Sequence, residues 1–411
     1  MRFSDLERIK EKALAPEPKK PVRAFPTPER EKVKSEDTVA PPPSTLVIQP
    51  SSFPSANTPA PSNIPEPAKQ PSGGGPKSRR EAMALSRAPK APFKELDAEA
   101  REVYSRVLDQ AGTFLKAVDQ PYTEKYEAVL ATCGLIVETL KNNGVLLNYT
   151  NYSTAEDYLR AHTANTTILA LALGLEAGLE DPELRLLGFC SMAHDIGMTE
   201  YAALYNRADR LGENEFAEMA LHAEAGVAKL DRIVDLDYKI KERAGHIVLQ
   251  THERVDGSGY PDRLSDEEID PLAQFISIAD AFEAMTHPRA WRDAINPPEA
   301  IKELVEKEGR GFNAKAVKAL ISAISIYPPG SIVVLSSGEI CRVLSVTRGF
   351  LTKPLVEILL DHEFSQVNSR QLDLFEHPLT SIERSVSFKE IADRNPKYAA
   401  RLEMSRWWVE W

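Results

Sequence analysis

Proline is concentrated at one end of this 411-residue chain, and this distribution limits where a compact fold can form. Eighteen of the thirty prolines lie within residues 1–92, interleaved with Ser, Ala and Lys and a Gly73–Gly75 run, and aromatic residues are almost absent there. Such a segment buries too little apolar surface to offset the chain entropy lost on folding. We therefore expect residues 1–92 to be a disordered, Pro-rich tail, with the folded part of the chain following it.

Charge divides the chain at nearly the same position. Residues 1–90 carry sixteen Lys and Arg against ten Asp and Glu; because the whole chain has a net charge of −11, residues 91–411 carry −17. A body this acidic repels the phosphates of duplex DNA and of anionic membranes unless a metal ion or a local cationic patch intervenes. The sequence therefore argues against DNA as a partner, and any phosphate chemistry would require a metal ion.

Cysteines and apolar runs indicate the cellular compartment. The three cysteines are widely spaced and form no CxxC pair, so the sequence predicts neither a disulfide framework nor a zinc-thiolate site. No apolar run reaches the roughly 18 residues that span a bilayer, and the N-terminus lacks the hydrophobic segment of a signal peptide. We expect a cytoplasmic protein without a membrane span.

From Asp97 onward, apolar residues recur at helical spacing. Residues 97–148 predict a pair of helices, with a break at Pro121 and an end at Gly144. We interpret the pair as a packing element, and a homodimer contact is an open alternative. Further helices are predicted from a capping box at Ser153 and Glu156 to Gly174 or Gly178, from Asp181 to His194, and at 213–230, 235–252, 266–285 and 297–306.

The pattern changes after Pro328-Pro329-Gly330. Three runs rich in β-branched residues follow, separated by turn residues such as Ser336-Ser337-Gly338, and they predict about three antiparallel strands. The expected fold is therefore mainly α: a helical bundle at 150–325, preceded by the 97–148 region and followed by a small β-rich module at 328–411.

Histidines and acids in the helical body suggest metal ligands. His162 lies on an inner helical stripe, where a lone histidine is more often a hydrogen-bonded core residue. His194 and Asp195 stand where a helix ends, so both side chains can turn toward one point, although the dipeptide alone is weak evidence. Asp280 interrupts an apolar run, and burying its carboxylate costs several kcal/mol unless it is paired or bound to a cation.

A second group surrounds a glycine-containing loop. His222 follows Glu215 and precedes Gly226 on a helix, and His252 ends another helix just before Asp256-Gly-Ser-Gly-Tyr-Pro261. Glycines at 257 and 259 allow backbone groups to approach a ligand, and Pro261 stiffens the exit from the loop. A tight turn alone would explain Gly and Pro, but it leaves the preceding His-Glu pair unexplained.

Taken together, these motifs resemble the HD phosphohydrolase signature and, within it, the HD-GYP subgroup. The HD part of the resemblance rests on His162, His194-Asp195 and Asp280. The HD-GYP part rests on His222, His252-Glu253-Arg254 and Gly259-Tyr260-Pro261, with Glu215, Gly226, the stretch 279–285 and Arg289 in support.

The resemblance implies a helical domain with two divalent ions, iron or manganese, that hydrolyses cyclic di-GMP to pGpG and GMP. Asp195 would bridge the ions and, with His194, form the catalytic pair. His162, His194 and Asp280 would bind the first ion, and His222 and His252 the second. Such ions lower the pKa of water and offset charge on phosphoryl oxygens. Gly257, Gly259, Tyr260 and Pro261 would hold the substrate or form a partner surface; Arg289 would support that loop at the substrate or face solvent.

Two positions depart from the family pattern. Thr251 stands where the family usually has a second histidine before the glutamate, and Met198 where it usually has a lysine three residues after the HD aspartate. His246 should point away from the site, and His287 is interpreted as a loop residue. One alternative to the enzyme therefore stays open, a catalytically degenerate domain that binds a nucleotide or a protein. A scaffold that recruits protein partners through the Pro-rich tail is compatible with either function.

Overall fold

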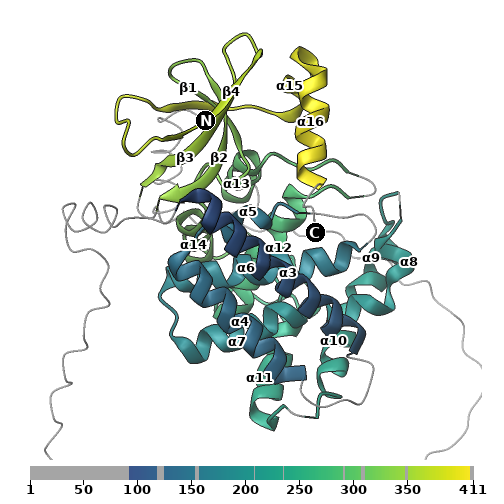
Figure 1. Cartoon of the computed structure of the whole chain (residues 1–411). Helices are drawn as coiled ribbons and strands as arrows, with labels where there is room; N and C mark the ends of the chain where they lie inside the picture. The colour runs from purple at the N-terminus through teal and green to yellow at the C-terminus, as the bar shows by residue number, and fades with distance from the viewer. Residues whose placement is uncertain are drawn as a thin grey trace, which may run out of the picture. The chain divides into compact units, whose positions relative to one another are not determined.

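The computed structural model describes residues 92–117, 125–152, 157–207, 209–234, 236–289, 292–306, 311–347 and 350–407 (Figure 1). The expected disordered tail, apart from its last residue, and the expected capping box at Ser153 and Glu156 lie outside these residues. Helices dominate the described chain and one antiparallel sheet follows them, so the predicted mainly α fold class is confirmed. Within the described residues, no helix is both long enough and apolar enough to cross a membrane.

The helical body contains twelve α-helices among the described residues, with two 3₁₀ helices, η1 (Ile196–Glu200) and η2 (Asp266–Glu268). The α-helices are α3 (Phe93–Ala117), α4 (Lys125–Asn142), α5 (Leu146–Tyr149), α6 (Tyr158–Ala177), α7 (Asp181–Ala193), α8 (Ala202–Tyr205), α9 (Glu213–Ala220), α10 (His222–Leu230), α11 (Tyr238–Leu249), α12 (Pro271–Thr286), α13 (Pro297–Glu306) and α14 (Ala314–Ile324).

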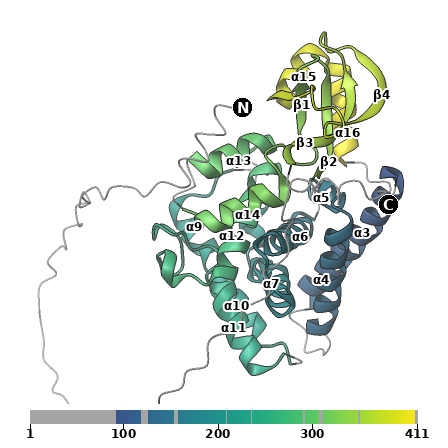
Figure 2. The same cartoon turned by 90° about the vertical axis from the view of Figure 1, so that its left-hand side faces the viewer.

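Helix α6 forms the centre of this body. It is buried almost all round from Leu159 to Gly174, and it contacts α3, α4, α7, α12 and α14. Figure 2 shows α6 between α3 and α12. A helix without a polar face must be covered on all sides, so the polar residues of α6 lie in the interior and require partners there.

Most helix boundaries follow the expected signals. Gly178, with a φ of 79°, ends α6 in the left-handed conformation that glycine adopts readily. Pro182 lies in the first turn of α7. The prediction of one continuous helix at 213–230 is wrong, because the chain forms two helices, α9 and α10, that meet at Leu221. Helix α14 was not predicted.

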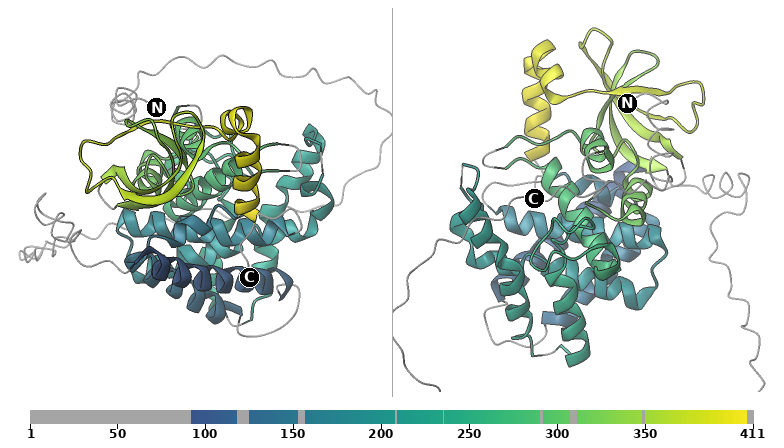
Figure 3. Two further views of the ribbon diagram at one scale, coloured as in Figure 1. Left: turned by 45° about the horizontal axis from the view of Figure 1, so that its top comes forward. Right: turned by 180° about the vertical axis from the view of Figure 1, so that it is seen from behind.

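The C-terminal sheet has five strands, so the expected three were too few. They are β1 (Ile332–Leu335), β2 (Ile340–Thr347), β3 (Phe350–Leu360), β4 (Gln366–Asp373) and β5 (Ile382–Ser385), all antiparallel, in the order β4-β3-β2-β1-β5. Figure 3 shows this sheet, in light green, from two further sides. Strand β4 is polar and mostly exposed, and β5 has only four residues, so neither carries the apolar alternation that predicts a strand. Two helices follow, α15 (Phe388–Arg394) and α16 (Pro396–Trp407).

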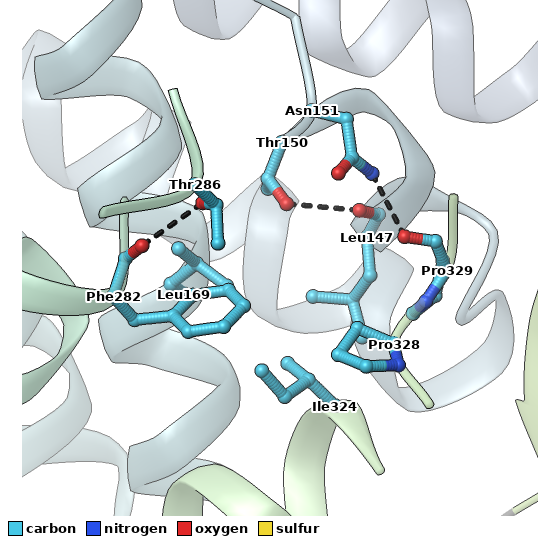
Figure 4. A pocket seen from close by; sticks show the side chains of 9 residues that line it. All are labelled: Leu147, Thr150, Asn151, Leu169, Phe282, Thr286, Ile324, Pro328 and Pro329. Atoms are coloured by element: carbon cyan, nitrogen blue, oxygen red, sulfur yellow. Dashed lines mark hydrogen bonds between the residues drawn. The ribbon is translucent and has the colours of Figure 1, made fainter. Parts of the chain in front are cut away.

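Hydrogen bonds from asparagines join the helical body to the C-terminal part. Asn148 Nδ2 donates to the carbonyl of Leu344 at 2.5 Å, and Asn151 Nδ2 to that of Pro329 at 3.0 Å. Figure 4 shows the second bond beside a cavity of about 10 Å³, which is no larger than one water molecule. Its lining is mainly apolar, and the hydroxyls of Thr150 and Thr286 donate to carbonyls of their own helical turns. This junction is therefore a packing contact.

Helix α7, which leads to His194, packs closely on α4 because Gly188 has no side chain. A Cβ at Gly188 would lie 2.6 Å from Cys133 Sγ and 2.9 Å from Cys133 Cβ. Gly134, on the exposed side of α4, has open space around it. The two glycines therefore provide a matched pair on neighbouring helices.

We predict that Gly188→Ala lowers the free energy of unfolding by about 1–3 kcal/mol, because the added methyl group overpacks the contact between α4 and α7. Gly134→Ala should raise it by about 0.5–1 kcal/mol, because alanine restricts the unfolded chain more than glycine does. Urea unfolding of the full chain measures both. An unchanged stability in Gly188→Ala would contradict the described packing of α7.

Candidate functional site

Four imidazoles surround the carboxylate of Asp195, and its two oxygens divide them into pairs. Asp195 Oδ2 lies 3.4 Å from His162 Nε2 and 3.6 Å from His194 Nε2. Asp195 Oδ1 lies 3.3 Å from His222 Nε2 and 3.5 Å from His252 Nε2. The structure thus forms two clusters of potential ligands that share one carboxylate.

Five separate segments supply these side chains. His162 comes from the buried face of α6, and Asp280 from α12. His194 and Asp195 occupy the turn between α7 and η1, His222 is the first residue of α10, and His252 follows α11. The predicted convergence of His194 and Asp195 at a helix end is therefore present, and all four histidines are buried.

Local acceptors orient three of the imidazoles. His194 Nδ1 lies 2.7 Å from the carbonyl of Ser191, and His222 Nδ1 lies 2.7 Å from that of Met219. His162 Nδ1 lies 2.5 Å from Glu283 Oε2. Each acceptor oxygen accepts a hydrogen bond from Nδ1–H, which directs the Nε2 lone pair into the site, the usual arrangement of metal-binding histidines.

Asp280 lies between the two clusters. Its Oδ1 is 3.2 Å from His162 Nε2, and its Oδ2 is 3.7 Å from His252 Nδ1. The sequence assigned Asp280 to the first ion alone, whereas its carboxylate contacts one histidine of each pair. Like Asp195, Asp280 thus contacts histidines of both clusters.

The electrostatics of the site favour added positive charge. Burial would raise the pKa of the Asp280 carboxyl, but hydrogen bonding to His162 and the charges of nearby histidines lower it to about 2. Burial would also raise the pKa of Asp195, yet the charge of His194 and the nearby imidazoles of the other three histidines hold it well below its usual range. These carboxylates therefore stay ionised in an interior where a bare negative charge is costly.

Two divalent metal ions fit this set of donor atoms. Asp195 Oδ1 is buried without a hydrogen-bond partner in the described part of the chain, and such an orphaned oxygen is costly unless a cation or donor satisfies it. The ligands are imidazoles and carboxylates, with no thiolate among the clustered side chains. Iron, manganese and similar ions accept this mixture.

Sequence reasoning missed Glu283, whose carboxylate is fully buried behind His162. Its Oε1 lies 3.1 Å from Asn165 Nδ2 and 3.3 Å from His287 Nδ1, and its Oε2 contacts His162. Burial would raise the pKa of Glu283, but His287 and His162 lower it to about 2. The available signal was the spacing, because Glu283 lies three residues after Asp280 on one helix face. His287, interpreted from the sequence as a loop residue, follows the last residue of α12 with an extended backbone, and its side chain is buried.

The segment after Asp195 depends on a glycine. In η1, Gly197 lies directly against the backbone of α10, where an added Cβ would overlap the carbonyl oxygen of His222. The missing side chain lets η1 approach α10, and this approach brings Asp195 to His222. Gly226, on the opposite side of the same contact, has ordinary space, with its nearest neighbour Ile196 Cγ2 3.4 Å from an added Cβ.

The two departures from the family pattern each have local partners. The Thr251 hydroxyl donates to the carbonyl of Val248 at 2.9 Å. Met198 packs in an apolar cluster with Leu115 and Leu159. His246 is exposed and pairs with Gln250, so the prediction that it points away from the site is confirmed. Neither departure therefore adds a ligand or a positive charge.

The loop containing Gly257, Gly259, Tyr260 and Pro261 is anchored by Glu253. The Glu253 carboxylate accepts backbone N–H groups of Asp262, Arg263 and Leu264 at 2.7–3.0 Å. A Cβ at Gly259 would overlap the backbone of Glu253, and Gly257 has a φ of 74°. Glu253 therefore shapes the loop, and the glycines allow its close return.

Tyr260 covers the second pair of histidines. Its ring stacks on His252 with the centroids 5.1 Å apart and the planes 13° apart, and it meets His222 edge-on at 6.2 Å. Burial, with the negative charges of Asp195 and Asp280, raises its pKa well above the usual value. The tyrosine of the loop thus contacts the candidate ligands directly.

Arg289 is half-buried beside an aromatic ring. Its guanidinium lies 3.9 Å from the ring centroid of Tyr158, which stacks on His162 at 5.4 Å. Burial and the charge of Arg292 lower its pKa to about 9. No carboxylate in the described residues forms an ion pair with it. Arg289, Tyr158 and His162 thus form a stack, and the support of the loop by Arg289 stays a prediction.

Two parts of the chain match known protein families, and several known proteins are similar to it. A family model described as "HD domain" matches residues 151–315, and one described as "KOW domain associated with HD domain" matches 332–394. A cyclic di-GMP phosphodiesterase of Pseudomonas aeruginosa is 31% identical over 221 residues, which cover 53% of this chain and 52% of that protein. A 3'3'-cGAMP-specific phosphodiesterase of Vibrio cholerae is 30% identical, covering 39% of this chain and 30% of that protein. The chain therefore spans about half the length of the first relative and less of the second.

One solved structure, of a protein described as HDG"Y"P from Bdellovibrio bacteriovorus, aligns with a TM-score of 0.47 at 20% identity. It covers 59% of this chain and 76% of that chain.

We predict that Gly197→Ala lowers the affinity for Mn²⁺ at least about tenfold, because the methyl group pushes η1 and Asp195 away from α10. Gly226→Ala should leave the affinity within about twofold, since the same contact accepts a methyl group there. Titration of the metal-free chain with Mn²⁺ and a competing chelator measures both. Equal affinities in the two variants would show that Asp195 does not depend on this close approach.

Proposed function

We propose that this chain, which belongs to the HD-GYP family through the HD domain at residues 151–315, hydrolyses the phosphodiester bonds of a cyclic dinucleotide. Cyclic di-GMP is the proposed substrate, with pGpG and then GMP as products. The observation that carries the proposal is the division of four buried imidazoles between the two oxygens of Asp195. Relatives named as phosphodiesterases of cyclic di-GMP and cGAMP support the substrate class.

The chain's own residues would hold two divalent ions, proposed to be iron or manganese. His162, His194 and Asp195 would bind one, and Asp195, His222 and His252 the other, with Asp280 near both. Bound ions of this kind polarise phosphoryl oxygens and lower the pKa of water, which allows hydrolysis near neutral pH. The Nδ1 contacts described above fix the ligands in place before an ion arrives, which reduces the reorganisation that binding requires.

Residues around the ligands would bind the substrate. Arg289 is the cation nearest to His162 in the described stack, so it would contact a substrate phosphate and supply charge that Met198 cannot. Phe216 is 48% exposed and meets Tyr260 edge-on at 5.8 Å. An exposed aromatic ring beside the site offers a stacking surface for a nucleobase.

We further propose four regions: a Pro-rich tail at 1–92, a helical region at 97–148, the HD-GYP domain at 150–325 and the β-rich module at 328–411. The Pro-rich tail and the loop that contains Gly257, Gly259, Tyr260 and Pro261 are proposed surfaces for protein partners. We also propose a homodimer. A cytoplasmic location is likewise proposed, from the reducing environment that the unpaired buried cysteines suit.

A second candidate function is binding without turnover. It is favoured by Met198, which stands where the family usually has a lysine and packs in an apolar cluster. This position therefore offers no positive charge to a substrate phosphate. In that case the domain would hold ions and a cyclic dinucleotide and act as a signalling module. The two candidates differ in products, since both bind the nucleotide and only the enzyme releases pGpG or GMP.

We predict that the full chain, reconstituted without oxygen with Fe²⁺ or Mn²⁺, converts cyclic di-GMP to pGpG and GMP, as resolved by chromatography. Asp195→Asn should reduce the rate by at least about 10³-fold, because both ion positions lose their shared charged ligand. Asp231→Asn, an exposed acid at the far end of α10, should not change the rate.

Nucleotide binding without products would replace the enzyme by the second candidate. Full activity in Asp195→Asn would overturn the site itself.

A further inference from the structure

We propose that Tyr104 of helix α3 is a positioning residue for His162, acting through Asn165 and Glu283. The ion position formed by His162 and His194 would then depend on a helix that lies before residues 151–315 in the chain. This inference rests on the proposed function, because it takes His162 as a metal ligand.

The chain of contacts begins at a tyrosine without solvent exposure. Tyr104 is 0% exposed, and its hydroxyl donates to Asn165 Oδ1 at 2.7 Å. Burial and the negative charge of Glu283 raise the pKa of Tyr104 well above the usual value, so its hydroxyl keeps its proton. Because it keeps its proton, this buried hydroxyl acts as a hydrogen-bond donor to Asn165.

Asn165 is oriented by partners on both ends of its amide. Its Oδ1 accepts from Tyr104, and its Nδ2 donates to the carbonyl of Tyr152 at 2.9 Å and to Glu283 Oε1 at 3.1 Å. One oxygen thus faces a donor, and two N–H groups face two acceptors. Removing the Tyr104 hydroxyl would leave Oδ1 buried without this partner, a state that side-chain rotation relieves.

Glu283 transmits the position of Asn165 to His162. Its two oxygens have different partners, because Oε1 contacts Asn165 and His287 while Oε2 lies 2.5 Å from His162 Nδ1. A carboxylate held on both sides fixes the rotation of the imidazole, and with it the direction of Nε2. A shift of Asn165 therefore changes the aim of one ligand.

The second ion position has separate support. His222 is held by the carbonyl of Met219 in its own chain segment, and His252 is covered by Tyr260. Neither contact includes Tyr104, Asn165 or Glu283. Loss of the Tyr104 hydroxyl should therefore weaken one ion and spare the other, which a general loss of stability would not do.

Tyr149 provides a matched control. Its ring lies 5.6 Å from that of Tyr104, but its hydroxyl bonds with the Asp97 carboxylate and carbonyl at 3.0 and 3.2 Å, outside the network. Tyr149→Phe and Tyr104→Phe each delete one hydroxyl from the same aromatic cluster. Only the second interrupts the path to His162.

The test is a Mn²⁺ titration of the full chain, with the two binding steps resolved by calorimetry and by electron paramagnetic resonance. Tyr104→Phe should weaken one step about tenfold, the lower end of the range for residues that orient ligands, and leave the other within about twofold. Tyr149→Phe should leave both unchanged. Asn165→Ser, which interrupts the same path at its next member, should reproduce the selective loss.

Equal weakening of both steps, or no change in Tyr104→Phe and in Asn165→Ser, would overturn the inference. If Tyr104→Phe fails to fold, the result for Asn165→Ser decides alone. Failure of the unmodified chain to bind Mn²⁺ would instead overturn the proposed function, so the two failures are distinguishable.

Discussion

The buried carboxylate of Asp195 is the constraint on which the rest of the structure depends. An ionised acid inside a helical core is costly unless positive charge surrounds it, and here four imidazoles converge on its two oxygens. Four segments must meet for this to happen, and α12 adds Asp280 as a fifth. Three glycines allow the close packing around them. Gly188 lets α7 approach α4, Gly197 lets η1 approach α10, and Gly259 lets the loop after His252 return against Glu253. Removing any of these close approaches would displace a different ligand.

The ligands are themselves held by a surrounding layer of acceptors. Carbonyls three residues earlier in the chain hold His194 and His222, whereas a carboxylate on a distant helix holds His162. The two proposed ion positions therefore differ in their support, because only the one with His162 also depends on a contact through the core. This difference connects α3, outside the matched HD domain, to the chemistry of the site, and it explains why Tyr104 is buried with its hydroxyl directed inward.

Much of the site could be predicted from sequence, because its ligands are unusual residues in recognisable places. His194-Asp195 ends a helix, Asp280 interrupts an apolar run, and His252 precedes a glycine loop. The supporting residues could not be predicted in this way. Glu283 lies 121 positions from His162, and Asn165 lies 61 from Tyr104, so no local pattern relates them. The strand β4 escaped prediction for the opposite reason, since its exposed polar residues leave no apolar period.

The central claim is that one carboxylate is shared by two ions. Electron paramagnetic resonance of the chain loaded with two equivalents of Mn²⁺ tests it most directly, because ions joined by a bridging carboxylate lie close enough for their spins to couple. The account predicts a coupled spectrum that disappears in Asp195→Asn. A simple six-line spectrum of isolated Mn²⁺ in the fully loaded, unmodified chain would contradict it.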